Sequence, residues 1–199
     1  MSLKVRGLCT TILRPTHFEL ADGDTLIISG SSGAGKTLLL RAIADLDPSE
    51  GEVEADGLRR EQMSGPHWRR LVRYVAAEPA WWAERVGEHF RDSDAAGIRA
   101  ERLGLPDGCM KSPISRLSTG EKQRLGFLRA TEHRPRILLL DEPTASLDPR
   151  SALAVETMLR ELLDEGASAV VVTHSAEQAK RLGGRCMQMD GGRLAAVTT

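Results

Sequence analysis

The sequence predicts an α/β fold in which helices cover a mostly parallel β-sheet. Residues 137–140 form a continuous apolar run of strand length, which is typical of a strand buried on both faces. Runs of this kind alternate with longer segments whose apolar residues recur at helical spacing, as between residues 149 and 165. With 199 residues and 41% hydrophobic content, the chain is long enough for one buried core with a small appended lobe.

The N-terminal part is expected to add antiparallel strands on one side of that sheet. Short apolar stretches around Leu3 and Phe18, separated by turn residues, lead into the buried run 26–28. Apolar residues at helical spacing then predict a helix over residues 36–46, and a brief strand begins at Val53.

The middle of the chain has a different character. Residues 71–75 predict another buried strand, whereas from residue 78 to 115 apolar side chains are scattered among charged ones without β-branched runs. We expect short helices there, followed by a helix over residues 120–134. Residues 1–199 are therefore predicted to form one domain that contains a small helical subdomain over about residues 78–134.

The C-terminal part continues the alternation of helix and strand. Asp148 and Pro149 are a good N-cap and first-turn pair for a helix that reaches Glu165. A buried strand over residues 169–173 follows, and then Ser175 and Gln178 fit a capping box for one more helix. Residues 187–197 predict a closing hairpin.

A phosphate loop lies at the centre of this pattern. Residues 30–37 read Gly-Ser-Ser-Gly-Ala-Gly-Lys-Thr and fit the Gly-x-x-x-x-Gly-Lys-Ser/Thr pattern at every fixed position. Because the loop joins a strand to a helix, a bound phosphate would lie at a helix N-terminus, where free amides favour anions. The sequence thus predicts a P-loop NTPase core. Its expected ATP-binding residues are Gly30, Ser31, Ser32, Gly33, Ala34, Gly35, Lys36, Thr37 and Leu38.

Two carboxylates at a strand end complete the expected chemistry. Asp141 directly follows the apolar run 137–140, where a phosphate-loop enzyme needs a carboxylate to hold Mg²⁺ together with the hydroxyl of Thr37. Glu142 is next, and a second carboxylate there can deprotonate the attacking water. ATP and Mg²⁺ are therefore the expected substrate and cofactor, with Lys36 reaching the outer phosphates.

Composition excludes several other classes. The net charge of −1 gives no electrostatic case for binding nucleic acid or a membrane surface. No apolar run approaches the roughly 18 residues that a membrane-spanning helix needs, and the N-terminus has no secretory signal. Cys9, Cys109 and Cys186 match no metal pattern and suit reduced thiols, so we expect a cytoplasmic location.

Taken together, the motifs resemble those of ABC-type ATPases, the ATP-binding subunits of ABC transporters. The resemblance rests on residues 30–37, 117–124, 138–148 and 173–174, whose order and separations match the family across nearly the whole chain. It implies a head-to-tail homodimer and a separate transmembrane permease subunit, at the inner face of the cell membrane. A direct nucleic-acid partner is not expected.

The resemblance also implies roles for residues outside the phosphate loop. Ser118, Thr119, Gly120 and Glu121 resemble the family signature, which contacts the γ-phosphate bound by the other subunit. Thr119 stands in place of a usual glycine and Glu121 in place of a usual glutamine. Residues Ser146, Leu147 and Asp148 match the loop between the two sites, and His174 matches the histidine that reaches the γ-phosphate.

Two departures from the family pattern concern the nucleotide. No aromatic residue between Val5 and Thr16 is available to stack on adenine, so Leu13 or Arg14 is expected to contact the base instead. Ala77 aligns with the family's glutamine that touches Mg²⁺. We hypothesise that the neighbouring Glu78 approaches the metal in its place; the alternative is a solvated loop carboxylate.

The lobe leaves further alternatives open. Trp81 and Trp82 are either an anchor for the membrane subunit or core residues of the small lobe. Residues 105–107 with Lys111 and Ile114, followed by the run 120–124, look similar to small stand-alone subunits of the iron-export type, which is weak evidence for a substrate. The competing functions are a nucleotide-gated regulatory module with little hydrolysis and a soluble ABC-type ATPase that acts on nucleic acid.

Overall fold

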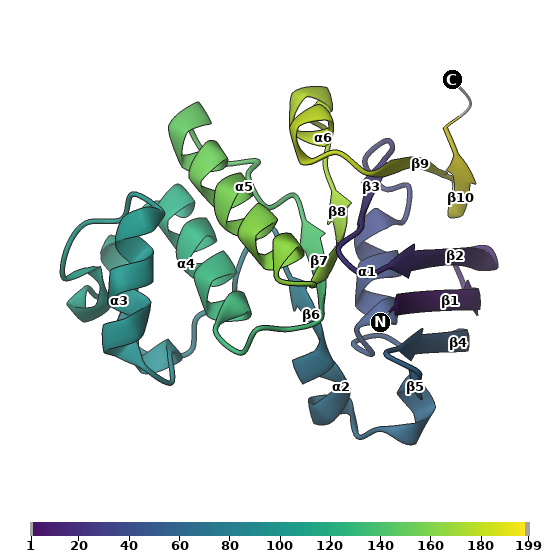
Figure 1. Ribbon diagram of the computed structural model, residues 1–199, viewed down its shortest axis with the longest axis horizontal. Helices are drawn as coiled ribbons and strands as arrows, with labels where there is room; N and C mark the ends of the chain where they lie inside the picture. The colour runs from purple at the N-terminus through teal and green to yellow at the C-terminus, as the bar shows by residue number, and fades with distance from the viewer. Residues whose placement is uncertain (1, 198–199) are drawn as a thin grey trace.

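The computed structural model describes residues 2–197, which form two β-sheets and six α-helices (Figure 1). The strands are β1 (Ser2–Cys9), β2 (Thr16–Ala21), β3 (Thr25–Ser29), β4 (Glu50–Ala55), β5 (Leu58–Arg59), β6 (Val72–Val75), β7 (Ile137–Asp141), β8 (Ser168–Val172), β9 (Arg185–Asp190) and β10 (Arg193–Ala196). The α-helices are α1 (Lys36–Ile43), α2 (Gly65–Leu71), α3 (Ser93–Arg102), α4 (Thr119–Thr131), α5 (Pro149–Asp164) and α6 (Ala176–Leu182). Short 3-10 helices are η1 (Arg60–Gln62), η2 (Val86–His89), η3 (Cys109–Lys111) and η4 (Ile114–Arg116).

The larger sheet has the strand order β10-β9-β3-β8-β7-β6, and its strands from β9 to β6 pair in parallel. Only the β9–β10 hairpin in it is antiparallel. The second sheet, in the order β2-β1-β4-β5, is antiparallel throughout. The predicted fold class, an α/β core with a mostly parallel sheet and antiparallel strands from the N-terminal side, is therefore confirmed.

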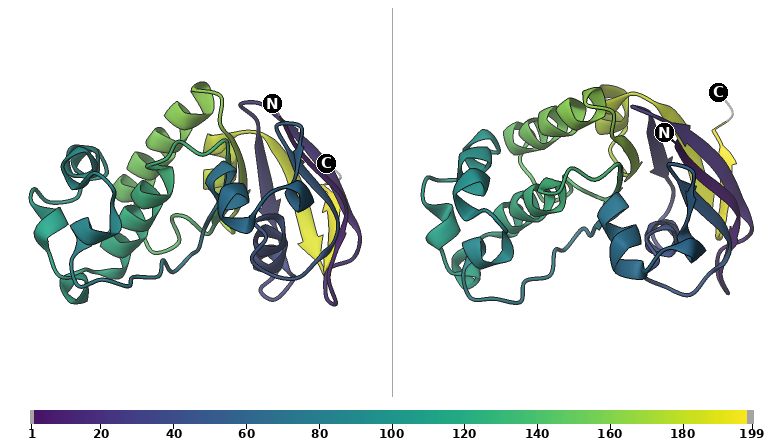
Figure 2. Two further views of the ribbon diagram at one scale, coloured as in Figure 1. Left: turned by 90° about the horizontal axis from the view of Figure 1, so that it is seen from below. Right: turned by 60° about the horizontal axis from the view of Figure 1, so that its bottom comes forward.

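The larger sheet separates two apolar layers. Alternate residues of one strand face opposite sides, so Leu139 of β7 packs with α1 and the antiparallel sheet while Leu138 and Leu140 pack with α4 and α5. Figures 1 and 2 show this arrangement, with α3, α4 and α5 at one end of the molecule and the antiparallel sheet at the other. Burial on both faces explains why the parallel strands are apolar along their whole length.

Several element ends differ from the sequence prediction. Helix α1 stops at Ile43 rather than residue 46, because Asp45 adopts a left-handed conformation (φ 57) and side chains bind the last carbonyls. Trp68 Nε1 donates to the Ile43 carbonyl oxygen at 2.8 Å, and Arg60 donates to that of Ala42 at 2.8 Å. Strand β4 begins at Glu50, which pairs with Cys9, rather than at Val53.

The predicted capping box of α6 is half wrong. Ser175 Oγ accepts from the Gln178 amide at 3.1 Å, as expected, but the Gln178 side chain does not turn back to the N-cap. It donates instead to Thr144 Oγ1 at 2.7 Å and to the buried Glu156 at 3.3 Å. By contrast, the N-cap of α5 is as predicted, since one Asp148 oxygen accepts from the amides of Arg150 and Ser151 at 3.0 Å each.

The segment between β6 and α4 contains the expected short helices η2, α3, η3 and η4. Its apolar residues join the layer that covers the α4 and α5 side of the sheet. The limits of a separate helical subdomain at residues 78 and 134 stay a prediction. Among the described residues, no helix combines the length and the apolar character needed to cross a membrane.

Candidate nucleotide-binding site

The phosphate loop connects the end of β3 to the start of α1. Gly30 has a φ of 146 and lies so close to the main chain of Met189 in β9 that a side chain there would overlap it. Lys36 is 7% exposed, and its Nζ donates to the carbonyl oxygens of Gly30 at 2.7 Å and Ser31 at 2.8 Å. Both acceptors are neutral, and among the described residues Lys36 forms no ion pair with a carboxylate.

Three polar side chains from separate elements meet at the end of β7. Asp141 is 4% exposed, and its Oδ2 accepts from Thr37 Oγ1 at 2.7 Å and from the Tyr74 hydroxyl at 3.0 Å. Burial, and then the neighbouring Asp141 carboxylate, raise the pKa of Tyr74 above its usual value. Tyr74 is therefore a phenol that donates to Asp141, and it fixes the carboxylate beside Thr37.

These oxygen atoms suit Mg²⁺. A hydroxyl and one carboxylate are hard donors, and Mg²⁺ in nucleotide sites takes its other ligands from phosphates and water. Among the residues that the structure describes, no group of three or more His, Cys, Asp or Glu side chains forms a metal site of its own. The donor set thus fits a magnesium ion that arrives with a nucleotide.

Glu142 is held in an unusual backbone conformation, with a φ of 49. Its amide donates to the Val172 carbonyl oxygen at 3.0 Å, and its own carbonyl oxygen accepts from Gln123 Nε2 at 2.8 Å. The Glu142 carboxylate lies 3.0 Å from His174 Nε2. Gln123 Oε1 also accepts from the Ser146 amide at 3.2 Å, so one side chain of α4 clasps both ends of the turn after β7.

A pocket of about 560 Å³ unites most of the residues predicted to bind ATP and Mg²⁺ or to act in catalysis. It is lined by Ile12, Ser32, Gly33, Gly35, Lys36, Thr37, Leu38, Arg41, Asp47, Ala77, Asp141, Glu142 and His174. Gly30 and Ser31 are not lining residues, but their carbonyl oxygens accept hydrogen bonds from Lys36, which is one. Ala34 is buried and does not line the pocket.

Some predicted residues lie elsewhere. Ala77 lines the pocket, but Glu78 is exposed and is not among the lining residues. Leu13 is only 2% exposed and packs into the core, so it does not present a surface to a base. Ile12, which is 61% exposed, is the aliphatic side chain that lines the pocket instead.

The signature residues lie outside this pocket, at the start of α4. Ser118 is the exposed N-cap, and its Oγ accepts from the Glu121 amide at 3.2 Å. Glu121 Oε2 accepts in turn from the Ser118 amide at 2.8 Å and from Ser118 Oγ at 2.9 Å. The glutamate that replaces the usual glutamine therefore completes a capping box. Thr119 is exposed, and Leu147 lies in a second hollow that shares Glu142 and His174 with the first.

Three contributors were missed by sequence reasoning. Tyr74 and Gln123 lie within motifs that were recognised, but only their hydrogen bonds to Asp141 and Glu142 reveal what they hold. Ile12 gave no signal beyond its position next to Leu13. The local backbone conformation determines that Ile12, and not the adjacent Leu13, faces the pocket.

Comparison with known proteins identifies the family to which the chain belongs. The family model described as ABC transporter matches residues 13–145. The methionine import ATP-binding protein MetN 1 of Pseudomonas fluorescens is 34% identical over 209 residues, which cover 95% of this chain and 62% of that protein. The phosphonates import ATP-binding protein PhnC of Thiobacillus denitrificans is 34% identical over 92% of this chain and 79% of its own length. The chain thus spans about three fifths to four fifths of these relatives.

Solved structures agree on the fold. A dimeric ATP-binding cassette bound to ADP and phosphate has a TM-score of 0.84 and 22% identity, with 99% of each chain covered. An ATP-bound bacterial Atm1-family ABC exporter also has a TM-score of 0.84, at 25% identity, over 98% of this chain and 38% of the exporter.

The phosphate loop, the strand-end carboxylates and the parallel sheet define a P-loop NTPase. Within that class, the chain belongs to the ABC transporter family and is an ABC-type ATPase.

Proposed function

We propose that this chain powers a membrane transporter by hydrolysing ATP at two composite sites of a head-to-tail homodimer. The observation that carries the proposal is the convergence of the loop lysine, Asp141, Glu142 and His174 on one pocket from segments far apart in the sequence. The relatives named for methionine and phosphonates differ in their solutes, so they support the class of function and no particular substrate.

When the phosphates of ATP bind, Lys36 exchanges one set of hydrogen-bond partners for another. Lys36 leaves the carbonyl oxygens of Gly30 and Ser31 and binds the outer phosphates, while the loop amides bind the rest of the triphosphate chain. Thr37 and Asp141 hold Mg²⁺, and Tyr74 keeps the Asp141 carboxylate aimed at it. When bound, Mg²⁺ supplies positive charge that offsets the charge developing on the transferred phosphoryl group.

At the reacting phosphorus, Glu142 is the general base and His174 the γ-phosphate contact. The clasp from Gln123 holds the Glu142 backbone in place, so its carboxylate needs only a side-chain rotation away from His174 to accept a proton from water. Most of the rate enhancement then comes from positioning and electrostatics.

The opposite subunit completes each site. Ser118, Thr119, Gly120 and Glu121 start a helix of 13 residues, whose N-terminal amides favour a phosphate across the dimer interface. Ser118 Oγ must exchange its bond to Glu121 for one to the phosphate. Ser146, Leu147 and Asp148 follow the same turn that Gln123 clasps, which supports their role in communication between the two sites.

In this proposal the transport path itself belongs to a separate membrane subunit. The chain would act at the cytoplasmic face of the membrane through that subunit. The import ATP-binding relatives support this assignment.

One observation favours a second candidate, a nucleotide-gated module with little hydrolysis. Ala77 lines the pocket where the family has a glutamine that touches Mg²⁺, and the exposed Glu78 does not replace it there. Such a module would bind ATP and dimerise without steady-state turnover.

The test compares the purified chain with the variants Glu142→Gln and Glu78→Gln. We expect Mg²⁺-dependent ATP hydrolysis in the parent, a loss of at least about 100-fold in Glu142→Gln, and an ATP-dependent dimer of that variant on size-exclusion chromatography. Glu78→Gln is the matched control and should keep the parent rate. Tight ATP binding without turnover in the parent would favour the regulatory module, and hydrolysis that survives Glu142→Gln would overturn the assignment of the base.

A further inference from the structure

Helix α6, which directly follows the His174 loop, is held in place mostly by polar contacts. Of its residues, all of which the structure describes, only Gln178 is buried, while Ala179 and Leu182 are partly buried against the apolar layer of α4 and α5. A surface helix is usually fixed by a stripe of buried apolar side chains. The position of α6 depends instead on what Gln178 and, one turn further, Arg181 bind.

Both of these side chains bind Glu156, a carboxylate of α5 that is only 1% exposed. Arg181 donates to it from Nε to Oε2 at 2.7 Å and from Nη2 to Oε1 at 2.8 Å. Gln178 Nε2 donates to the same Oε1 at 3.3 Å. Because the donors come from two successive turns of α6, Glu156 fixes the rotation of that helix as well as its distance from α5.

Gln178 also links α6 to the turn that carries Glu142. Its Nε2 donates to Thr144 Oγ1, on that turn, at 2.7 Å. The amide nitrogen of a glutamine has two N–H groups, so the bonds to Thr144 and Glu156 use both of them. Glu156 thereby determines which way the Gln178 amide faces, and with that whether it can hold Thr144.

These contacts flank the two residues proposed to act at the γ-phosphate. His174 lies between Thr173, whose amide donates to the Ile28 carbonyl oxygen at 3.2 Å, and Ser175, whose Oγ caps α6. The Glu142 carboxylate is 3.0 Å from His174 Nε2. The base and the histidine thus meet where the turn after β7 meets the start of α6.

Glu156 itself is set back from the nucleotide. It lines neither the nucleotide pocket nor the neighbouring hollow of about 640 Å³, which shares Glu142 and His174 with that pocket. Gln178 and Arg181 do line this hollow. Any influence of Glu156 on the reaction therefore passes through other side chains.

We propose that Glu156 is a positioning residue for ATP hydrolysis, which holds α6, and with it His174, against the turn that carries Glu142. The inference rests on the proposed function, because it adds to that function the group that sets the base and the histidine relative to each other. A buried ion pair contributes little net stability, since lost hydration offsets the attraction, and apolar residues of similar size hold two helices as well. Hydrogen bonds have a preferred direction, so they fix the orientation of α6 more narrowly than apolar contacts do.

The test replaces the ion pair by apolar side chains in the double variant Glu156→Met/Arg181→Met. Because both charges are removed together, neither is left buried and unpaired, and the variant should melt within about 5 °C of the parent. The turnover number should fall at least about tenfold, since small displacements of catalytic groups lower the rate steeply. The affinity for Mg²⁺–ADP, measured by calorimetry, should stay within about twofold, because ADP lacks the γ-phosphate that His174 is proposed to contact. A loss of ADP affinity as large as the loss of turnover would overturn the inference.

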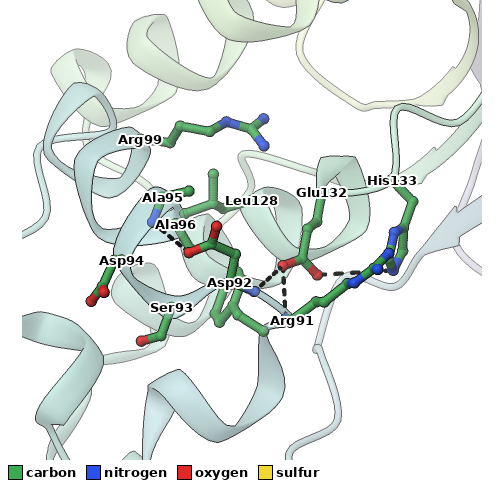
Figure 3. Close-up of a pocket in the computed structure, with 11 residues that line it drawn as sticks. Arg91, Asp92, Ser93, Asp94, Ala95, Ala96, Arg99, Leu128, Glu132 and His133 are labelled. Carbon is green, nitrogen blue, oxygen red and sulfur yellow. Dashed lines mark hydrogen bonds and ion pairs between the residues drawn. The ribbon is translucent and has the colours of Figure 1, made fainter.

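The matched control is Glu132, which also joins two elements through its carboxylate. Figure 3 shows Glu132 directed toward the start of α3, where its Oε1 accepts from the amides of Arg91 at 2.7 Å and Asp92 at 3.1 Å. It lines neither the nucleotide pocket nor the hollow beside it. Glu132→Met should therefore keep the parent turnover within about twofold. An equal loss in the control would show a general effect of loosened packing and would overturn the inference.

A second variant tests the contact with the turn. Thr144→Val nearly keeps the shape of the side chain and removes the hydroxyl that Gln178 binds. We expect the same fall in turnover, and no further fall when it is combined with Glu156→Met/Arg181→Met, because both changes interrupt one path. Turnover at the parent rate in either variant, or losses that simply add, would overturn the inference and leave the proposed function intact. If the parent itself does not hydrolyse ATP, the proposed function fails and this inference fails with it.

Discussion

The nucleotide pocket differs in the pairing of its charged side chains from a second pocket, of about 410 Å³, which Arg73 of β6 and Arg129 of α4 line. In the nucleotide pocket Lys36 bonds two loop carbonyls, Asp141 accepts from two hydroxyls, and Glu142 lies against His174. In the second pocket, Arg73 Nε and Arg129 Nη1 have no hydrogen-bond partner among the described residues, whereas Arg129 Nη2 donates to the Ala80 carbonyl oxygen at 2.9 Å. The charged groups of the nucleotide pocket therefore have partners before a ligand binds, whereas one guanidinium N–H of each arginine in the second pocket has none.

This difference predicts different energetics. The bonds that Lys36 would form with ATP replace two that it already makes to loop carbonyls, so only the difference between the two sets favours binding. Strand β6 joins the two sites, because Arg73 and Tyr74 are consecutive and therefore point to opposite faces of the sheet.

The largest effect is expected where the nucleotide pocket loses Asp141, the carboxylate proposed to hold Mg²⁺. Asp141→Asn keeps the shape and the bonds from Thr37 and Tyr74 but removes the charge. Mg²⁺-dependent turnover should fall by at least about 100-fold, since the charge of the metal site is lost. A rate within tenfold of the parent over a Mg²⁺ titration would show that another group carries the metal.

A smaller loss of turnover is expected when the hydrogen bonds from Gln123 to the turn after β7 are removed. Gln123→Ala removes the hydrogen bond to the Glu142 carbonyl oxygen, which costs about 0.5–1.5 kcal/mol of stability, and frees the turn that carries the proposed base. We expect turnover to fall about tenfold with ATP affinity nearly unchanged, because the phosphate loop is untouched. Steady-state kinetics beside Lys122→Ala, one position earlier on α4, separates the clasp from a general effect on the helix. An equal loss in both variants would contradict the clasp.

The sequence alone was sufficient for the parts of these sites that are contiguous. The phosphate loop, Asp141 with Glu142, and the N-cap Asp148 each depend on neighbours within a few residues, so local pattern and local structure agree. Hydrophobic runs likewise predicted the parallel sheet, because a strand covered on both faces must be apolar throughout.

What the sequence could not supply depends on contacts between distant residues. Gln123 and Glu142 are 19 positions apart, and the hydrogen bond from Tyr74 to Asp141 spans 67. Neither spacing carries a pattern, since the fold alone brings the pairs together. The same holds for Trp81 and Trp82: Trp81 packs against the lobe core and Trp82 is 71% exposed, although Arg129 lies 4.6 Å from both rings.

A substitution at Ile12, in the lining of the nucleotide pocket, is expected to increase the affinity for ATP. Ile12 lines the pocket at the position where an aromatic ring could stack on adenine. Ile12→Tyr should tighten ATP binding by about fivefold, which is the lower end of the 1–3 kcal/mol of a base–aromatic stack. Titration with a fluorescent ATP analogue measures it, and Ile12→Leu is the matched control without a ring. No gain would mean that the base does not approach residue 12.

The smallest effect concerns the link between the two pockets, Tyr74, and is best seen in alkaline solution. Tyr74→Phe removes one hydrogen bond to Asp141 and should cost about 0.5–1.5 kcal/mol of stability at neutral pH. The pKa of Tyr74 is raised in the folded chain, so the folded state keeps its proton where the unfolded state has lost it. The stabilisation is thus fully present below the unfolded pKa of about 10, and as pH rises above that value the parent should lose stability faster than the variant, by at most about 1.4 kcal/mol per pH unit. Urea unfolding of both proteins at several pH values from neutral to alkaline measures the difference. Since Tyr74 is the only tyrosine in the sequence, ultraviolet absorbance reports its titration directly, and an ordinary phenol titration in the folded chain would contradict the contact with Asp141.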